Sequence, residues 1–367
     1  MMINSYPKSL YIHIPFCDNI CGYCDFFRVK HNNKLVENWL NTLATEISAT
    51  VKTKELDTIY LGGGTPSCLS LKQLRKLLEI IKPYSLECIE YTIEVNPESI
   101  TKEKIALLKS YGINRVSMGV QSTSVKLLNE MNRKHTNEQV TKAIEQFKLA
   151  KIDNISLDFI YSLPNQTMND IENTLKQFKK WDVTHISIYS LTIEKGSQFY
   201  RDSKDKLDDE TEADMYEYIL KTLDDMNFER YEISSFCKNN KKSLHNLCYW
   251  NDQDFYGISI GASSKINGVR YDNTTNFIDY FNNLYKKDTI ILNDKERKFE
   301  AIMMGLRLVD GININAFNKK YNTDLTLEYK EPIRIAKENK WITCDENLKC
   351  TKKGLDLCNS VVELFYI

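Results

Sequence analysis

The stretch YIHIPFCDNICGYCDF, residues 11–26, decides how the fold of this sequence is interpreted. Cys17, Cys21 and Cys24 follow an apolar, strand-like run with the spacing C-x3-C-x2-C, and no fourth cysteine lies close by. A cubane iron–sulfur cluster ordinarily takes four thiolates, one for each iron. Three thiolates on one loop therefore hold three corners and leave the fourth iron with an open position, which is the mark of a reactive metal site. We expect these three cysteines to hold a [4Fe–4S] cluster.

Two other roles for the three cysteines stay open at this point. A structural zinc site commonly takes four ligands, often as two C-x2-C halves, and this loop supplies only one such half. A disulfide is disfavoured, because no secretory leader is visible and a reducing cytoplasm is the expected compartment. The other seven of the ten cysteines are interpreted as small buried hydrophobes.

The overall composition indicates an ordinary globular protein. The chain has 367 residues, of which 42% are hydrophobic and 27% charged, and its formal net charge is −1. This charge gives no electrostatic reason to expect a nucleic-acid partner. No apolar run reaches the roughly 18 residues of a membrane span, so we expect a cytoplasmic protein without a transmembrane segment and leave peripheral contact with a membrane open.

The first two-thirds of the sequence alternates short β-rich runs with helical patterns. Strands are expected at 10–14, 58–61, 91–95, 115–119, 154–160 and 185–191, with a weaker one at 230–234, and helices at 35–51, 71–81, 102–111, 137–150 and 168–181. This rhythm implies parallel βαβ units. The fold class expected is α/β: a partial (βα)6 barrel of the TIM type, whose chemistry collects at the C-terminal ends of the strands.

The remaining sequence divides into two further parts. We predict a barrel with its cysteine loop in 1–205, a barrel extension in 206–292 that begins with a helix at 210–226, and a C-terminal domain in 293–367. The last part has helical patterns at 294–309, 315–321 and 330–340, and then two β-like pieces around Asp345-Glu346-Asn347, which is typical of a winged helix. Its acidic and basic residues are nearly balanced, so a packing or lid role is favoured over DNA binding.

Several polar or glycine-rich segments follow the predicted strands. The run GGGTPS, residues 62–67, removes side chains where a ligand can approach the backbone, or it is simply a tight turn. Glu94, Gln121 and Asp158 lie at strand ends, where buried polar groups are costly unless they are paired. Arg133 is suited to a bidentate contact with a carboxylate. Taken singly, each of these side chains is also explained as a salt bridge, a helix cap or a solvated cation.

The segment HNLCYW, residues 245–250, is the last motif that carries chemistry. His245 or Cys248 is a candidate axial ligand for haem iron, and the flat rings of Tyr249 and Trp250 suit a macrocycle. The alternative is a hydrogen-bonded histidine in an aromatic core.

With the motifs LYIHIPFC, YLGGGTPS, IEVNPE, RVSMGVQS and DFIYSLPNQT in view, the chain resembles the radical S-adenosylmethionine (SAM) superfamily, in its coproporphyrinogen dehydrogenase-like branch. The resemblance covers nearly the whole chain and implies the partial barrel with its extra domain. It also implies SAM as a cofactor, cleaved with an electron from a reductant such as flavodoxin or ferredoxin. The residues that it places around SAM are Tyr11, Tyr23, Gly63, Gly64, Thr65, Glu94, Gln121, Arg133 and Asp158.

One position separates two members of that branch. The dehydrogenases carry another cysteine two positions after the third, where this chain has Phe26. Together with HNLCYW, this makes the chain most similar to the HemW family of haem chaperones. The resemblance then implies haem held near His245, Tyr249 and Trp250 and delivered to acceptor haemoproteins. Oxygen-independent coproporphyrinogen III dehydrogenase activity and a purely structural metal protein are the two alternatives, and a homodimer is left open.

Overall fold

The computed structural model describes residues 6–366 and shows an α/β fold built on one large sheet. The sheet has nine strands in the order β11-β1-β4-β5-β6-β7-β8-β10-β9. Its six central strands are parallel to one another and follow chain order. They are β1 (Ser9–Ile14), β4 (Thr58–Gly63), β5 (Glu90–Val95), β6 (Arg115–Gln121), β7 (Asn154–Tyr161) and β8 (His185–Ser190).

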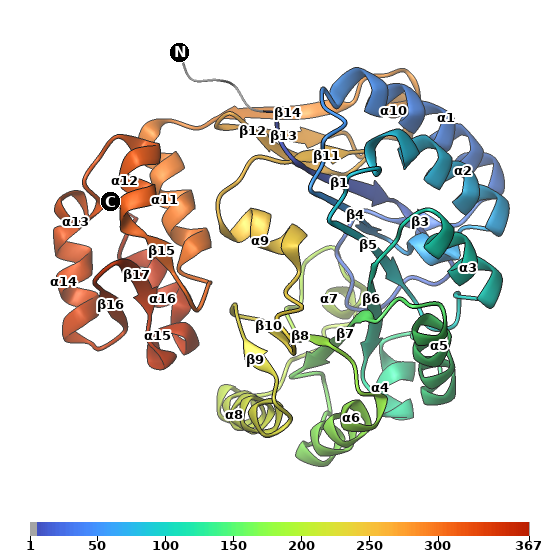
Figure 1. The fold of residues 1–367 in the computed structure, drawn as a ribbon. Coiled ribbons are helices and arrows are strands. Elements are labelled where there is room, and N and C mark those ends of the chain that lie inside the picture. The colour runs from blue at the N-terminus through green and yellow to red at the C-terminus, as the bar shows by residue number, and fades with distance from the viewer. Residues whose placement is uncertain (1–5, 367) are drawn as a thin grey trace.

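The edges of this sheet do not pair with each other, so the barrel is partial. On one side β11 (Tyr256–Ile258) adds to β1 in parallel. On the other side β10 (Ser235–Cys237) pairs antiparallel with β8, and β9 (Glu229–Arg230) pairs antiparallel with β10. The weak strand expected at 230–234 is therefore wrong, because the chain turns back in this stretch to form the β9–β10 hairpin. Figure 1 shows the strands curving round an inner space.

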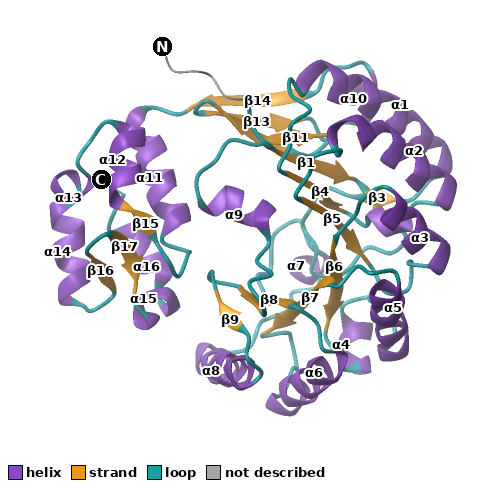
Figure 2. Ribbon diagram, in the orientation of Figure 1, coloured by secondary structure: helices purple, strands orange, loops and turns teal. Residues whose placement is uncertain are grey.

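Helices cover the outer face of the curved sheet (Figure 2). The long ones are α1 (Asn33–Thr50), α2 (Leu71–Ile81), α3 (Lys102–Ser110), α5 (Asn137–Leu149), α6 (Met168–Trp181) and α8 (Asp209–Asp225), and the short ones are α4 (Val125–Glu130) and α7 (Gln198–Arg201). Capping boxes at Ser70, Thr136 and Thr167 fix the first turns of α2, α5 and α6, because each side chain and the residue three positions later satisfy each other's backbone N–H groups.

Apolar and polar residues alternate along the strands. The apolar positions, such as Ile12, Val116 and Leu157, are buried in the core between the sheet and its helices. The positions between them are mostly polar, and several of these, including Ser117 and Asp158, line the inner space. Successive strand residues point to opposite faces, so this pattern gives a dry outer layer and a polar interior.

The barrel extension covers the N-terminal ends of several barrel strands. Helix α9 (Leu244–Trp250) lies against the strands at their N-terminal ends. A separate antiparallel sheet, β12 (Ser263–Ile266), β13 (Val269–Asn273) and β14 (Lys286–Ile291), continues from β11, and α10 (Phe277–Phe281) packs beside α1.

The C-terminal part has its own hydrophobic core, which is formed by residues between 301 and 365. It contains α11 (Asp294–Gly305), α12 (Ile314–Tyr321), α13 (Leu325–Glu328), α14 (Lys330–Glu338), α15 (Lys352–Asp356) and α16 (Cys358–Glu363). Strands β15 (Ile312–Asn313), β17 (Asn347–Cys350) and β16 (Ile342–Cys344) form a small antiparallel sheet, with the β16–β17 hairpin at the predicted wing. The domain boundaries at 205/206 and 292/293 stay predictions.

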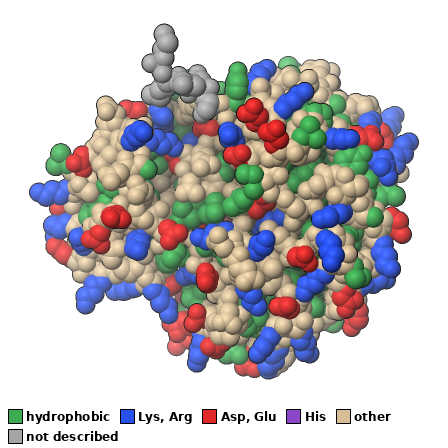
Figure 3. All heavy atoms as spheres, viewed as in Figure 1, with side chains coloured by type: hydrophobic (Ala, Val, Ile, Leu, Met, Phe, Trp, Pro, Cys, Tyr) green, Lys and Arg blue, Asp and Glu red, His purple; other side chains and the backbone are tan. Residues whose placement is uncertain are grey.

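Charged side chains connect this helical part to the barrel extension. The carboxylate of Asp252, just after α9, accepts hydrogen bonds from Lys265 and, across the boundary, from Lys320 and Tyr321 of α12. Glu300 of α11 pairs with Lys265 at 3.2 Å. On the face of the molecule seen in Figure 3, acidic and basic side chains are interspersed. No helix within the described chain is long and apolar enough to cross a membrane.

Candidate cofactor site in the barrel

A cavity of about 480 Å³ lies inside the partial barrel and brings together segments far apart in the sequence. Of the residues predicted to hold cofactors, Cys17, Cys21, Tyr23, Cys24, Gly63, Gly64, Thr65, Glu94, Gln121, Arg133 and Asp158 line it. Tyr11 is the exception among the predicted SAM residues. Its hydroxyl lies 3.0 Å from Nδ1 of His13, and its ring packs beside Tyr60, whose own ring does reach the cavity wall.

The cysteine loop (residues 17–24) is fixed to the turn that follows β4. The N–H of Gly64 donates to the carbonyl of Ile14 at 2.8 Å, and the N–H of Thr65 donates to the carbonyl of Phe16 at the same distance. The Thr65 hydroxyl also donates to Sγ of Cys17 at 3.5 Å. Backbone hydrogen bonds from the glycine-rich run therefore hold the segment that leads into the cysteine loop.

Arg133 connects the loop to the far wall of the cavity. Its Nη1 donates to Sγ of Cys21 at 3.5 Å, and its Nη2 donates to Oδ1 of Asn96 at 3.0 Å and to the carbonyl of Gly119. Arg133 therefore joins the cysteine loop to the ends of β5 and β6 through a single guanidinium.

The chemistry of the three thiols fits a cubane cluster. Burial raises the pKa of Cys17 to about 11 and also raises the pKa of Cys24, so both thiolates need a cationic partner such as iron. Across residues 6–366, no three His, Cys, Asp or Glu side chains converge on a point suited to one metal ion. A cubane offers a separate iron to each thiolate, so it suits three thiols spread along a loop better than a single zinc ion does.

Glu94 supports the glycine turn from the neighbouring strand. Its Oε1 accepts a hydrogen bond from the Tyr60 hydroxyl at 2.9 Å, and its Oε2 accepts one from the N–H of Gly63 at 3.1 Å. Gly63 has a φ of 110°, a conformation that side chains other than hydrogen rarely tolerate. Burial raises the pKa of Glu94 to about 7. A cationic ligand in the cavity would restore the charged form.

Asp158 is the second acid of the cavity wall, and like Glu94 it is half-buried. Both of its carboxylate oxygens accept from the Ser117 hydroxyl, at 3.0 and 3.1 Å, and burial raises its pKa. With Glu94, it gives the cavity two desolvated acids that suit the sulfonium or ammonium group of a ligand.

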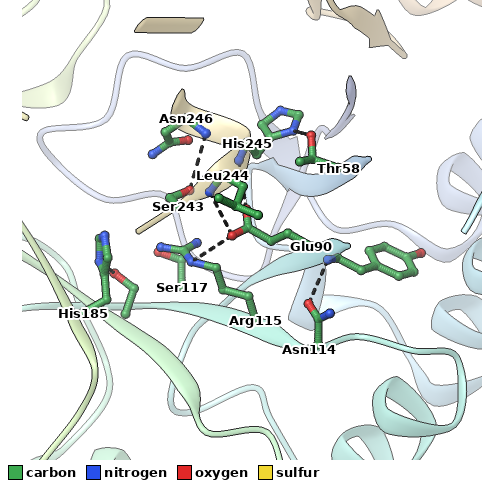
Figure 4. A network of polar contacts seen from close by, with 12 residues as sticks. Thr58, Glu90, Asn114, Arg115, Ser117, His185, Ser243, Leu244, His245 and Asn246 are labelled. Carbon is green, nitrogen blue, oxygen red and sulfur yellow. Dashed lines mark hydrogen bonds and ion pairs between the residues drawn. The ribbon is translucent and has the colours of Figure 1, made fainter. Parts of the chain in front are cut away.

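The segment predicted to bind haem lies below this cavity. His245 is fully buried on α9, with Nδ1 2.8 Å from Oγ1 of Thr58 and Nε2 2.7 Å from the Tyr249 hydroxyl (Figure 4 shows the Thr58 contact). Both ring nitrogens are therefore engaged. Burial, and after it the positive charge of Arg115, lowers the pKa of His245 to about 3, so the imidazole is neutral.

The other members of the HNLCYW segment face different surroundings. Trp250 lines a smaller cavity of about 180 Å³ against α11 and α12, and the guanidinium of Arg307 lies 5.8 Å from its ring centroid. Cys248 is buried, with Sγ 3.8 Å from the carbonyl oxygen of Asp254. His245 and Tyr249 contact each other, whereas Trp250 faces the C-terminal part.

Comparison with known proteins places these observations in a family. Residues 11–178 match the family described as "Radical SAM superfamily", and residues 292–357 match "HemN C-terminal domain". Two curated relatives named "Heme chaperone HemW", from Lactococcus lactis and Bacillus subtilis, are each 35% identical over 98% of this chain, and the matches cover 98% and 99% of their own lengths. A relative of the same name from Escherichia coli is 28% identical over 99% of both chains.

The chain belongs to the HemW family of the radical SAM superfamily.

A solved structure shows the same architecture. The E. coli radical SAM enzyme coproporphyrinogen III oxidase (HemN) superposes with a TM-score of 0.86 at 18% identity, covering 99% of this chain and 90% of its own. This likeness confirms the predicted partial barrel with its helical C-terminal domain.

Membership of the superfamily gives the cysteine loop its cofactors, which are a [4Fe–4S] cluster and SAM. The residues of the cavity fit both groups, because three free thiols and two half-buried acids line it. Phe26, where the dehydrogenases of this branch carry a further cysteine, is 63% exposed at the same mouth.

Sequence reasoning missed several residues of the cavity wall. They are Tyr60, Arg115, Ser117, Ser187, Tyr189 and Asn246. Arg115, Ser117, Ser187 and Tyr189 occupy positions two or four residues from each other or from a predicted site residue on the same strand, so the two-residue period of the strands could have found them. Asn246 reaches the cavity through the docking of α9, which the sequence pattern does not reveal.

Proposed function

We propose that this protein is a haem chaperone of the HemW type, which binds haem and a SAM-coordinated [4Fe–4S] cluster and delivers haem to acceptor haemoproteins. The similarity over the full length to curated HemW relatives carries the proposal. Phe26 supports it, because the cavity mouth lacks the extra thiol of the dehydrogenases at that position.

In this proposal Cys17, Cys21 and Cys24 hold the cluster. When bound, the cluster supplies an open iron corner for the amino-acid group of SAM and a path for one electron. The side chains assigned to SAM surround the remaining space: Tyr23, Gly63, Gly64, Thr65, Glu94, Gln121, Arg133 and Asp158 directly, and Tyr11 from behind Tyr60. A reductant such as flavodoxin or ferredoxin, and pairing of two copies into a homodimer, belong to the same proposal.

We assign haem to the region of His245, Tyr249 and Trp250. Because both nitrogens of His245 are engaged by Thr58 and Tyr249, ligation by this residue requires one of these hydrogen bonds to break. Ligation through Nδ1 would require His245 to leave Thr58 of β4, whereas ligation through Nε2 would require only rotation of the Tyr249 side chain on the same helix.

The main rival is oxygen-independent coproporphyrinogen III dehydrogenase activity, which the shared fold with HemN favours and Phe26 opposes. The test is reconstitution of the cluster without oxygen, followed by parallel haemin titration and turnover of coproporphyrinogen III with SAM and a reductant. We expect a haemin Soret shift and no protoporphyrinogen.

A pair of histidine variants locates the haem. His245→Ala is expected to weaken haemin binding at least tenfold, whereas His31→Ala, at a half-buried histidine on the outer side of the barrel, should leave it unchanged. No Soret shift in the wild type, or formation of protoporphyrinogen, would overturn the proposed function. Equal haemin affinity in both variants would contradict only the assignment of haem to His245.

A further inference from the structure

The N-terminal ends of the barrel strands form a polar layer, and none of the cofactor assignments uses Arg115 or Asn246 in it. Arg115 is the first residue of β6, whereas Gln121, at the cysteine-loop end, is the last. Six residues at roughly 3.3 Å each separate their backbones by roughly 20 Å. A group bound at Arg115 is therefore distinct from the amino-acid group of SAM at the open iron.

Arg115 is buried without adequate partners. It is 1% exposed and lines the cavity, yet its Nε has no acceptor within hydrogen-bond distance in the described chain. The carboxylate that pairs with it, Glu90, lies 4.0 Å away. Burying a charge that is not fully hydrogen-bonded is costly, so such a group indicates that an acceptor belongs there.

Glu90 is already engaged elsewhere. Its Oε2 accepts from the N–H of Leu244 and its Oε1 from the N–H of His245, both at 2.9 Å. The carboxylate therefore caps the first turn of α9 and neutralises Arg115 only at a distance. Figure 4 shows the guanidinium extending from β6 towards this end of α9.

A second donor faces the same space from the helix. Asn246, next to His245, lines the cavity with Arg115. The hydroxyl of Ser117, two residues further along β6, already donates to Asp158. We call Arg115 and Asn246 together the cavity floor.

We propose that the cavity floor is a binding site for a carboxylate. The planar guanidinium offers two parallel N–H donors in the geometry that a carboxylate accepts, and the amide of Asn246 adds a third. The carboxylate would come from a small free acid or from a propionate of a tetrapyrrole. In either case it would contact α9, the helix that carries His245. The tetrapyrrole source rests on the proposed function, and the free acid does not.

The test uses the full-length protein and two kinds of probe. Succinate is titrated against the thermal midpoint, and haemin is compared with haemin dimethyl ester, which lacks free carboxylates, by Soret titration. The variants are Arg115→Gln and Arg115→Lys, with Arg334→Gln at an exposed arginine of α14 as the matched control. Asn246→Ala is a second test of the site that leaves the barrel strands untouched, in case Arg115→Gln does not fold.

For a propionate, we expect the wild type to bind haemin at least tenfold more tightly than the ester, and Arg115→Gln and Asn246→Ala to reduce this difference. For a small acid, we expect succinate to raise the thermal midpoint of the wild type and of Arg334→Gln but not of Arg115→Gln. If neither probe distinguishes the cavity-floor variants from the wild type, the inference is wrong. If haemin fails to bind while the succinate effect depends on Arg115, the proposed function fails and the carboxylate site stands.

Discussion

Nδ1 of His245 lies 2.8 Å from Oγ1 of Thr58, which fastens α9 to the first residue of β4. The same imidazole contacts Tyr249 through Nε2, so the ring works as a neutral bridge between the helix and the barrel. The Thr58 hydroxyl donates to Oγ of Ser9, so Nδ1 of the neutral ring donates to Thr58 and Nε2 accepts from Tyr249. Protonation would remove this acceptor and place a positive charge in a buried site, which is costly. The position of α9 should therefore depend on pH.

Acid should loosen α9. Burial lowers the pKa of His245 to about 3, against 6.5 for a free imidazole, so the stabilisation is complete above pH 6.5 and is lost as the pH falls below it. The loss is about 1.4 kcal/mol per pH unit between 6.5 and 3. Hydrogen exchange of residues 244–250, corrected for intrinsic rates, should show less protection at pH 5.5 than at pH 7.5. His245→Gln should flatten this dependence, whereas His31→Gln should retain it.

Gly64→Ala should disrupt cluster loading. A Cβ at this position would lie 2.6 Å from the carbonyl oxygen of Phe16 and 3.0 Å from Sγ of Cys17. The backbone of the cysteine loop would have to shift, at a cost of about 1–3 kcal/mol. Iron and sulfide per chain after anaerobic reconstitution should fall by more than half. Gly196→Ala, where a Cβ meets open space, should load normally, and normal loading of Gly64→Ala would contradict this account of the glycine.

Glu94→Gln should weaken SAM binding. The amide cannot accept from both the Tyr60 hydroxyl and the N–H of Gly63, as the carboxylate does, and it cannot balance a cationic ligand. One lost hydrogen bond to a charged group corresponds to about 1.5 kcal/mol or roughly a tenfold higher Kd. Equilibrium dialysis with SAM on the reconstituted protein measures this. Glu79→Gln, on the exposed side of α2, is the control and should bind as the wild type does.

Asp252→Asn should release the C-terminal part from the barrel extension. The Asp252 carboxylate accepts from Lys265, Lys320 and Tyr321, and breaking such a buried network costs about 3 kcal/mol. Limited proteolysis should then cut faster near residues 286–294, and small-angle scattering should show a larger radius. Asp209→Asn, at a side chain 97% exposed, should change neither. Unchanged proteolysis in Asp252→Asn would mean that apolar packing alone holds the two parts together.

The sequence predicted those elements whose limits are set locally. The predicted helices 71–81 and 168–181 coincide with α2 and α6, because capping boxes fix their starts within a few residues. It did not predict β11 or the docking of α9, because these depend on contacts made across more than 150 residues, such as His245 with Glu90.

The residues of the candidate site also divide into those that local sequence motifs predict and those that only the tertiary structure brings together. Cys17 was predicted from the cysteine spacing, Gly64 from the glycine run and Glu94 from its place at the end of a strand, and the family resemblance assigned the last two to SAM. Asn246 was missed because only the docking of α9 brings it to the cavity.

Because apolar and polar positions alternate along the strands, the residues that stabilise the fold differ from the residues that line the cavity. The contacts that hold the sheet to its helices are made by residues such as Ile12 and Leu157, which never face the interior. Inward residues such as Ser117 and Ser187 can therefore be exchanged without dismantling the scaffold. Evolution is then free to change what the barrel accepts while its foldability stays intact.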